Sequence, residues 1–144
     1  MPQIEQMEPQ EAYETLRSNP AAALVDVRTR AEWNFVGLPD TRDLGNRLAL
    51  VEWQRFPDMA VNDAFAQELT RQLDGDIPDT LLFICRSGAR SLHAAQMIAQ
   101  QMSDAGRDIR CINVAEGFEG DLDASAHRGQ RNGWKAGGLP WRQT

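Results

Sequence analysis

Residues 81–91 read Leu-Leu-Phe-Ile-Cys-Arg-Ser-Gly-Ala-Arg-Ser, and this stretch decides the fold of the chain. The apolar run 81–84 predicts a short buried strand. A helix is predicted over 87–102, because apolar residues recur there at helical spacing, namely Leu92, Ala95, Ala99 and Met102. The pattern is therefore strand, tight loop and helix, with Cys85 as the first residue of the loop.

A loop between a strand and a helix turns backbone N–H groups inward at a helix N-terminus, where the dipole favours negative charge. Both the helix N-terminus and nearby arginines stabilise a thiolate, so Cys85 is expected to ionise readily. Arg86 and Arg90 add positive charge for an anionic partner, and Gly88 lets the backbone curl tightly towards a ligand. We interpret Cys85 as a nucleophile facing an anion, although free cysteine is also often a buried structural residue.

Length and composition predict one soluble globular domain over residues 1–144. The chain is 42% hydrophobic and 25% charged, which is ordinary for such a domain. Its net charge of −6 argues against nonspecific binding to nucleic acid or to anionic membranes. The basic loop is therefore a local feature, and it suits a small anionic substrate.

The rest of the composition predicts a cytoplasmic protein. The start of the chain has neither the basic nor the apolar region of a signal peptide, and no apolar run approaches the roughly 18 residues of a membrane span. Cys85 and Cys111 are too few for a disulfide framework, and with His93 and His127 they show no metal-ligand spacing. Cys111 is expected to be a buried, inert thiol, with a resolving thiol as the alternative.

Helical and strand patterns alternate along the chain. Strands are predicted over 22–27, 48–53, 80–84 and 109–114, and further helical segments over 9–18, 31–36 and from a capping Asn62 to Leu73. Such alternation predicts βαβ units and a mainly parallel sheet covered on both faces. From Glu116 onward the regularity stops, and the aromatic residues there predict packed irregular structure rather than disorder.

Three motifs resemble those of the rhodanese family of sulfurtransferases. Residues 85–91 are similar to the active-site loop of that family, and residues 26–33, Asp-Val-Arg-Thr-Arg-Ala-Glu-Trp, resemble its first signature. Gly133-Trp134 and Gly138-Leu139-Pro140 resemble its closing segment. The three matches fall in the family's order and span residues 23–141.

The resemblance implies an α/β rhodanese-like three-layer domain, with a mainly parallel five-stranded sheet and helices on both faces. It also implies that the Cys85 thiolate takes a sulfur from an anionic donor such as thiosulfate, becomes a persulfide, and passes the sulfur to a thiol or cyanide. The loop would bind the donor and cradle the persulfide through Arg86, Ser87, Gly88, Ala89 and Arg90. No metal or organic cofactor is implied.

Asp26, Arg28 and Ser91 are interpreted as supporting residues. Asp26 and Arg28 end a strand at the edge where open α/β sheets bind ligands, and Asp26 is expected to orient the active loop. A simpler alternative pairs Arg28 with Glu32 at i,i+4 spacing.

The chain departs from the family pattern in two places. Gly37-Leu38-Pro39 stands where the family often has Gly-His-Ile, so no histidine is given a role there. A Gly/Asp-rich insert over 119–132 separates Gly117-Phe118 from Gly133-Trp134. An overhang above the active loop, narrowing the choice of substrate, is one role open to this insert.

Other functions stay open at this point. Cysteine-dependent phosphatases and arsenate reductases also hold a thiolate among backbone N–H groups, but their loops typically carry five residues between Cys and Arg. Here four residues separate Cys85 from Arg90. A non-catalytic rhodanese-like binding module is another alternative, although such modules often lose the cysteine. A sulfur relay to a protein acceptor would keep the chemistry and change only the partner.

Overall fold

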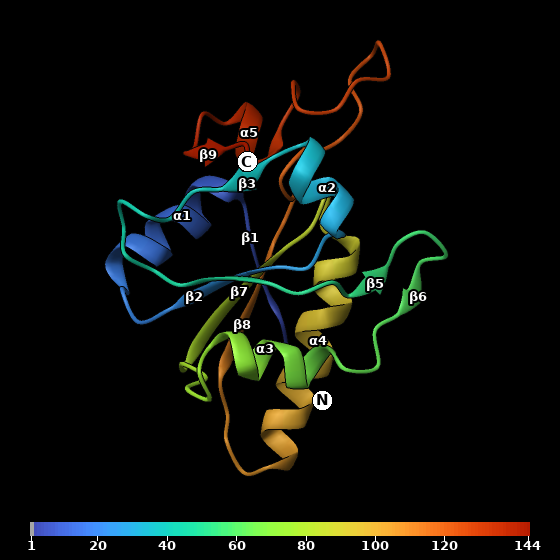
Figure 1. The fold of residues 1–144 in the computed structure, drawn as a ribbon. Coiled ribbons are helices and arrows are strands. Elements are labelled where there is room, and N and C mark those ends of the chain that lie inside the picture. Colours follow the sequence, from blue (N-terminus) through green and yellow to red (C-terminus); the bar gives the residue numbers. More distant parts are fainter. Residues whose placement is uncertain (1) are drawn as a thin grey trace.

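Residues 2–144 are described by a computed structural model, and a five-stranded sheet forms its centre (Figure 1). The strands are β1 (Glu5–Met7), β2 (Ala23–Asp26), β4 (Leu48–Leu50), β7 (Thr80–Ile84) and β8 (Arg110–Val114). They lie in the order β1-β8-β7-β2-β4, and every neighbouring pair is parallel. The predicted α/β class with a parallel five-stranded sheet is confirmed.

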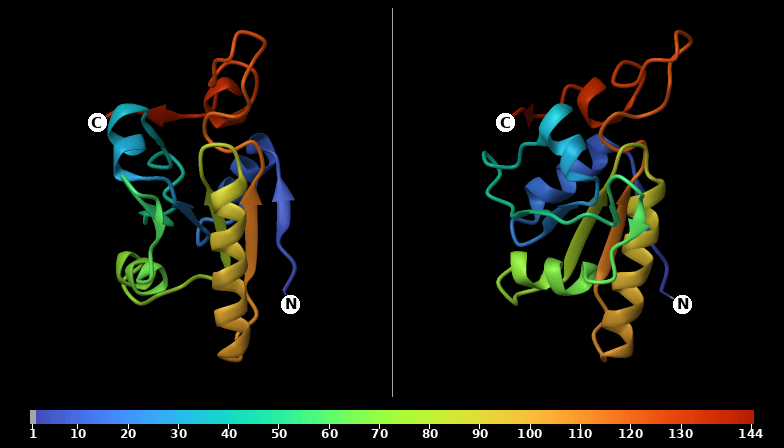
Figure 2. Two further views of the ribbon diagram at one scale, coloured as in Figure 1. Left: turned by 90° about the vertical axis from the view of Figure 1, so that its right-hand side faces the viewer. Right: turned by 45° about the vertical axis from the view of Figure 1, so that its right-hand side comes forward.

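Helices cover both faces of this sheet, as two further views show (Figure 2). Helices α3 (Phe65–Gln72) and α4 (Ala89–Asp104) pack on one face, and α1 (Pro9–Ser18) and the short α5 (Gly133–Ala136) pack on the other. Helix α2 (Arg30–Phe35) follows β2 directly. No helix within residues 2–144 is long and apolar enough to cross a membrane.

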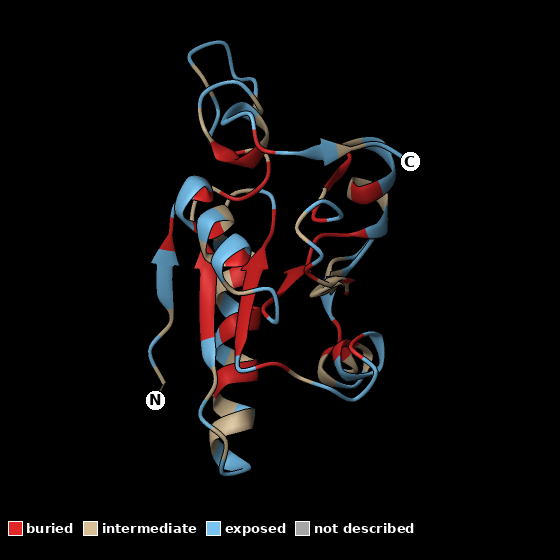
Figure 3. Ribbon diagram, turned by 90° about the vertical axis from the view of Figure 1, so that its left-hand side faces the viewer, coloured by how far each residue is buried: buried red, intermediate tan, exposed pale blue. Residues whose placement is uncertain are grey.

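Each face of the sheet carries its own hydrophobic core, and successive side chains along an inner strand point alternately into the two cores. On β7, Leu81 and Phe83 pack with α3 and α4, whereas Leu82 and Ile84 pack with α1. Because both faces of a parallel strand are buried, its sequence is a continuous apolar run rather than an alternating one. The inner strands are accordingly buried along most of their length, whereas the edge strand β1 is largely exposed (Figure 3).

Several boundaries differ from the predictions. Strand β1 was not expected, because it is an edge strand in which only Met7 is buried and no apolar pattern marks it. The hairpin of β5 (Gln54–Arg55) and β6 (Ala60–Val61) was also missed. Asn62 is not the helix cap: Ala64 occupies the N-cap of α3, and the Asn62 carboxamide oxygen accepts its N–H at 3.0 Å.

The segment after β8 is irregular, and it is packed around Phe118 and Trp134 as predicted, whereas most of residues 121–132 and Trp141 are exposed. Phe118 and Trp134 are fully buried, and the Trp134 indole donates to the Pro140 carbonyl at 2.8 Å. Strand β9 (Trp141–Arg142) then pairs antiparallel with β3 (Leu38–Pro39). The end of the chain is thereby tied to the segment that follows α2.

A buried ion pair lies where β2 ends. The Arg28 guanidinium donates to Asp26 at 2.6 Å, and both side chains are wholly buried. The same guanidinium donates to the Gly37 carbonyl at 2.7 Å and lies 4.3 Å from the centroid of the Phe118 ring. Arg28 therefore joins the end of β2, the turn after α2 and the segment after β8.

We predict that Asp26→Asn destabilises the protein by about 3–5 kcal/mol, because it leaves the buried Arg28 charge uncompensated. Urea unfolding followed by tryptophan fluorescence measures this loss. Glu14→Gln is the matched control, since Glu14 pairs with Arg17 on the surface and should change the free energy of unfolding little. A small and equal loss in the free energy of unfolding of both variants would contradict the burial of the Asp26–Arg28 ion pair.

Candidate active site

Cys85 follows β7, a strand in the middle of the sheet, and begins the loop that leads into α4. Its Sγ accepts the Gly88 N–H at 3.1 Å and lies 3.2 Å from the Ser91 hydroxyl. Gly88 is the N-cap of α4 with a φ of 109°, a backbone conformation that residues with a Cβ rarely adopt. The loop has the strand-loop-helix geometry expected from the sequence.

Cys85 is 1% exposed and lies in the wall of a pocket of about 430 Å³. Three elements form its walls: the active loop, the beginning of α2, and the β5–β6 hairpin. The walls outside the loop are formed by Thr29, Ala31, Glu32, Gln54, Phe56 and Met59. No acceptor within residues 2–144 takes the N–H groups of Arg86, Ser87, Ala89 and Arg90. This is usual for Ala89 and Arg90, which are in the first turn of α4, whereas Arg86 and Ser87 precede its N-cap. These donors are available to an anion in the pocket.

Arg90 forms a two-point ion pair with Glu32. Its Nη1 and Nη2 atoms lie 2.7 and 2.9 Å from the two carboxylate oxygens, and both side chains are mostly buried. The predicted alternative pairing of Arg28 with Glu32 is therefore wrong, since Arg28 pairs with Asp26. Arg90 was expected to bind the donor, but its outer guanidinium nitrogens already donate to Glu32.

Glu32 is held in place from a second side. The Thr29 N–H and hydroxyl both donate to its carboxylate, at 3.1 and 3.0 Å, and complete a capping box at the start of α2. The Thr-x-x-Glu spacing that marks such a box is visible in the sequence. Burial disfavours ionisation of Glu32, but the hydrogen bonds from Arg90 and Thr29 outweigh it and lower its pKa from 4.5 to about 2. For Arg90, burial opposes the charge, and the Glu32 hydrogen bond outweighs this and raises its pKa.

Arg86 is the exposed cation of the loop. No carboxylate within residues 2–144 pairs with its guanidinium, which lines the pocket beside Cys85. Its carbonyl accepts the N–H groups of Glu119 and Gly120 at 3.0 and 3.1 Å. The loop is thereby anchored to the segment that follows β8, and the Arg86 side chain is left free for a ligand.

A polar chain supports the loop from behind. The Ser91 hydroxyl contacts Cys85 Sγ and donates to Asn113 Oδ1 at 2.5 Å. Asn113 Nδ2 in turn donates to the Gly88 carbonyl at 3.0 Å and to Gln6 on β1 at 2.9 Å. Asn113 was missed from the sequence, although a buried amide within the apolar strand β8 is itself a signal, because buried polar groups need partners.

Asp26 and Arg28 do not touch the loop directly. Among residues 2–144 the Asp26 carboxylate accepts hydrogen bonds from Arg28 alone, so the expectation that Asp26 itself orients the loop needs correction. The effect is indirect: Arg28 packs on the Phe118 ring, and the Phe118 N–H donates to the Cys85 carbonyl at 2.8 Å. Gly117 permits this approach, because a Cβ there would lie 2.5 Å from the Cys85 carbonyl oxygen.

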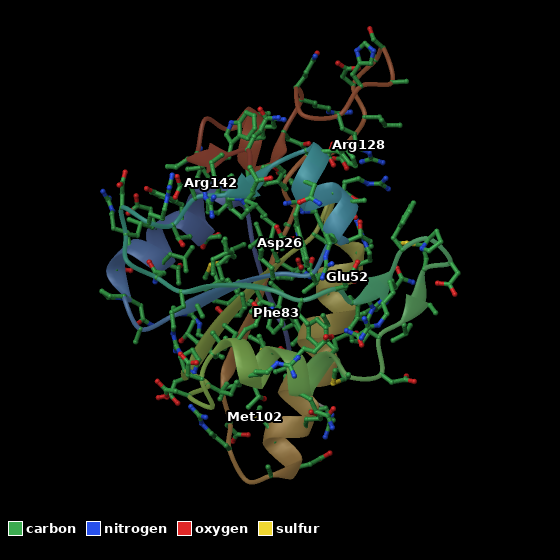
Figure 4. All side chains as sticks on the ribbon, in the orientation of Figure 1. Asp26, Glu52, Phe83, Met102, Arg128 and Arg142 are labelled. Atoms are coloured by element: carbon green, nitrogen blue, oxygen red, sulfur yellow. The ribbon has the colours of Figure 1, made fainter. Side chains whose placement is uncertain are left out.

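The predicted insert, residues 119–132, lies beside the active loop. The segment is closed by a hydrogen bond from Gly129 N–H to the Glu119 carbonyl at 2.7 Å and by one from Arg128 to the Gly120 carbonyl at 2.6 Å. Together with Glu32 and Arg86 it lines a second pocket of about 680 Å³. Figure 4 shows Arg128 on this segment near α2.

Cys111 lies on β8 with its side chain in the core that β7 shares with α3 and α4. It is 2% exposed, and burial raises the pKa of its thiol to about 12. Cys85 is equally buried, at 1% exposed, but it lines the pocket and Cys111 does not. The raised pKa and the lack of a pocket make the Cys111 thiol unreactive at neutral pH.

The two cysteines should therefore react differently with an alkylating reagent. In the native protein at about pH 8, iodoacetamide should reach Cys85 through its pocket and leave Cys111 unmodified. Intact mass should show one adduct in buffer and two in urea, and Cys85→Ser should show none in buffer. Two adducts on the native protein would contradict the burial of Cys111.

The Glu32–Arg90 pair should make stability depend on pH. Since folding lowers the pKa of Glu32, the carboxylate stabilises the folded state above about pH 4.5, and this contribution falls away as the pH drops towards 2. Glu32→Gln should be less stable than the wild type at pH 7, and the difference should shrink below pH 4.5. Urea unfolding at a series of pH values measures it, and a constant difference down to pH 3 would contradict the pairing.

Comparisons with known proteins agree with this fold. The chain is 37% identical over 131 residues to uncharacterized proteins of Rickettsia rickettsii and Rickettsia conorii, with 91% of each chain covered. It superimposes on the crystal structure of Rv0390 from M. tuberculosis with a TM-score of 0.84 and 45% identity, covering 99% of this chain and 100% of the other.

A rhodanese-like domain protein from Staphylococcus aureus shares the fold at 18% identity, with a TM-score of 0.54 and coverage of 95% of this chain and 97% of the other. The family model of the rhodanese-like domain matches residues 8–123. The chain belongs to the rhodanese-like domain family.

Proposed function

We propose that this protein is a sulfurtransferase that carries a sulfane sulfur on Cys85. One observation supports the proposal above all: the Cys85 sulfur accepts the Gly88 N–H at the start of α4 and faces a pocket that Arg86 lines. A helix N-terminus and a nearby cation favour the thiolate, which is the nucleophilic form of cysteine.

Transfer takes two steps. The Cys85 thiolate attacks the outer sulfur of an anionic donor, such as thiosulfate, and a new S–S bond forms. The bond between that sulfur and the rest of the donor breaks, and its electron pair leaves with the remaining fragment, which is sulfite when thiosulfate is the donor. A thiolate or cyanide then attacks the outer persulfide sulfur and releases Cys85 as thiolate. The product is a new persulfide or thiocyanate.

The loop stabilises charge in both steps. The Gly88 N–H donates to the Cys85 sulfur, and the N–H groups of Arg86, Ser87, Ala89 and Arg90, which have no acceptor within residues 2–144, would be available to the outer sulfur. Donors fixed in advance at a developing negative charge are an effective form of catalysis. The Ser91 hydroxyl adds a contact to the Cys85 sulfur, and the Arg86 guanidinium would bind the anionic end of the donor.

The proposal predicts that Cys85→Ser abolishes sulfur loading, since a hydroxyl cannot form a persulfide, whereas Cys111→Ser keeps most of it. Each protein is incubated with a sulfane-sulfur donor, and its intact mass is checked for one added sulfur atom. Thiocyanate release in the presence of cyanide measures turnover. Sulfur loading that persists in Cys85→Ser and disappears in Cys111→Ser would show that Cys111, and not Cys85, is the reacting residue.

A further inference from the structure

We propose that Glu32 selects the sulfur donor. With Glu32 in its wall, the pocket favours donors that carry a single negative charge and an organic group, which is the class of organic thiosulfonates and persulfides, over the inorganic dianion thiosulfate. This inference rests on the proposed function of Cys85 and specifies its substrate class.

The charges around the Cys85 sulfur disfavour a dianion. Two arginines line the pocket, but Glu32 lines it as well, and the reactive form of Cys85 is an anion. These formal charges cancel when Cys85 is ionised. A dianion entering the pocket therefore meets a carboxylate and a thiolate without a surplus of positive charge. A donor with one negative charge is repelled less, and it needs only one cation.

Arg90 is held away from the donor by its pairing with Glu32. Both of its outer nitrogens donate to Glu32, and Glu32 itself is fixed by the N–H and hydroxyl of Thr29. The pair is mostly buried, with 17% of the Arg90 side chain and 21% of the Glu32 side chain exposed. Turning Arg90 towards a donor would break a two-point ion pair and leave Glu32 uncompensated. Binding of the anionic group thus falls to Arg86.

Apolar side chains form the wall of the pocket outside the loop. The β5–β6 hairpin places Phe56 and Met59 on the pocket, and Ala31 and Ala89 complete this apolar lining. The Phe56 side chain is accessible, because the residue is 64% exposed. An organic substituent gains by covering these side chains, whereas thiosulfate has no apolar group to place there. Figure 1 shows the hairpin extending from the body of the protein beside α4.

The same two steps serve this class of donor. With an organic thiosulfonate, Cys85 bonds to the outer sulfur, the S–S bond of the donor breaks, and the electron pair leaves with the sulfinate. With an organic persulfide, the leaving group is the thiolate. No oxidant or reductant is consumed in either case.

The test compares three donors under single-turnover conditions: benzenethiosulfonate, methanethiosulfonate and thiosulfate. The rate of sulfur loading on Cys85 is read by intact mass, and each rate is divided by the rate of the same donor with a small free thiol. The wild type should favour benzenethiosulfonate over thiosulfate by roughly tenfold, the effect of about 1.4 kcal/mol in the barrier. Glu32→Gln should lower this ratio severalfold, because it removes the carboxylate charge and frees Arg90, while the apolar wall still favours the benzene compound.

Three further variants separate charge from structure. Glu32→Asp keeps the charge and should keep the wild-type donor ratio. Glu52→Gln is the matched control, since Glu52 accepts the Arg30 N–H at the start of α2 but does not line the Cys85 pocket, and it should also leave the ratio unchanged. Phe56→Ala should reduce the preference for the benzene over the methane compound, while thiosulfate loading changes little.

Two results would overturn the inference. One is a wild type that loads thiosulfate as fast as benzenethiosulfonate after normalisation. The other is a Glu32→Gln variant that changes the rates of all donors by one common factor, which is the effect of a structural role. If none of the donors loads Cys85 in a protein whose Cys85 still alkylates, the proposed sulfurtransferase function fails, and the donor preference fails with it.

Discussion

The buried ion pair of Asp26 and Arg28 stabilises the carboxyl-terminal ends of the sheet strands, where the active loop lies. Arg28 reaches the turn at Gly37 and the ring of Phe118, and Phe118 holds the Cys85 carbonyl through its backbone N–H. A wholly buried charge pair is costly to form, but it is also costly to disturb, because either charge alone would be stranded. The position of Cys85 is therefore fixed by contacts that lie outside its own loop.

A second ion pair sets the electrostatics of the pocket. Glu32 and Arg90 come from different elements, α2 and α4, and their pairing joins these two walls on either side of Cys85. Two arginines in the loop suggest a strongly cationic pocket, but the Glu32 carboxylate neutralises the charge of Arg90. The charge of Arg86 and the partial charges of the free N–H groups then remain for a ligand. Mutation of Arg90 would therefore change the shape of the pocket as well as its charge.

The sequence was sufficient where the signal is local or periodic. Buried parallel strands give continuous apolar runs, so β2, β7 and β8 were found, and the loop after β7 located the reactive cysteine. Features that depend on pairing across the fold were missed. Strand β1 is stabilised by its backbone bonds to β8 and carries no pattern of its own. The Glu32 partner of Arg90 was missed because it lies 58 positions away in the sequence, and the i,i+4 alternative for Arg28 was wrong because its guanidinium turns back to Asp26, two residues before it. Asn113 was missed for the same reason, since it donates to the carbonyl of Gly88, 25 positions before it in the sequence.

Sulfur transfer by this protein requires a covalent sulfur at one atom, the Sγ of Cys85. The most direct measurement is peptide mapping of the wild-type protein by tandem mass spectrometry after incubation with benzenethiosulfonate, before and after addition of cyanide. The account predicts one added sulfur on the peptide that contains Cys85, its loss on addition of cyanide, and release of an equal amount of thiocyanate. An added sulfur on the Cys111 peptide, or a sulfur on Cys85 that cyanide cannot remove, would contradict it.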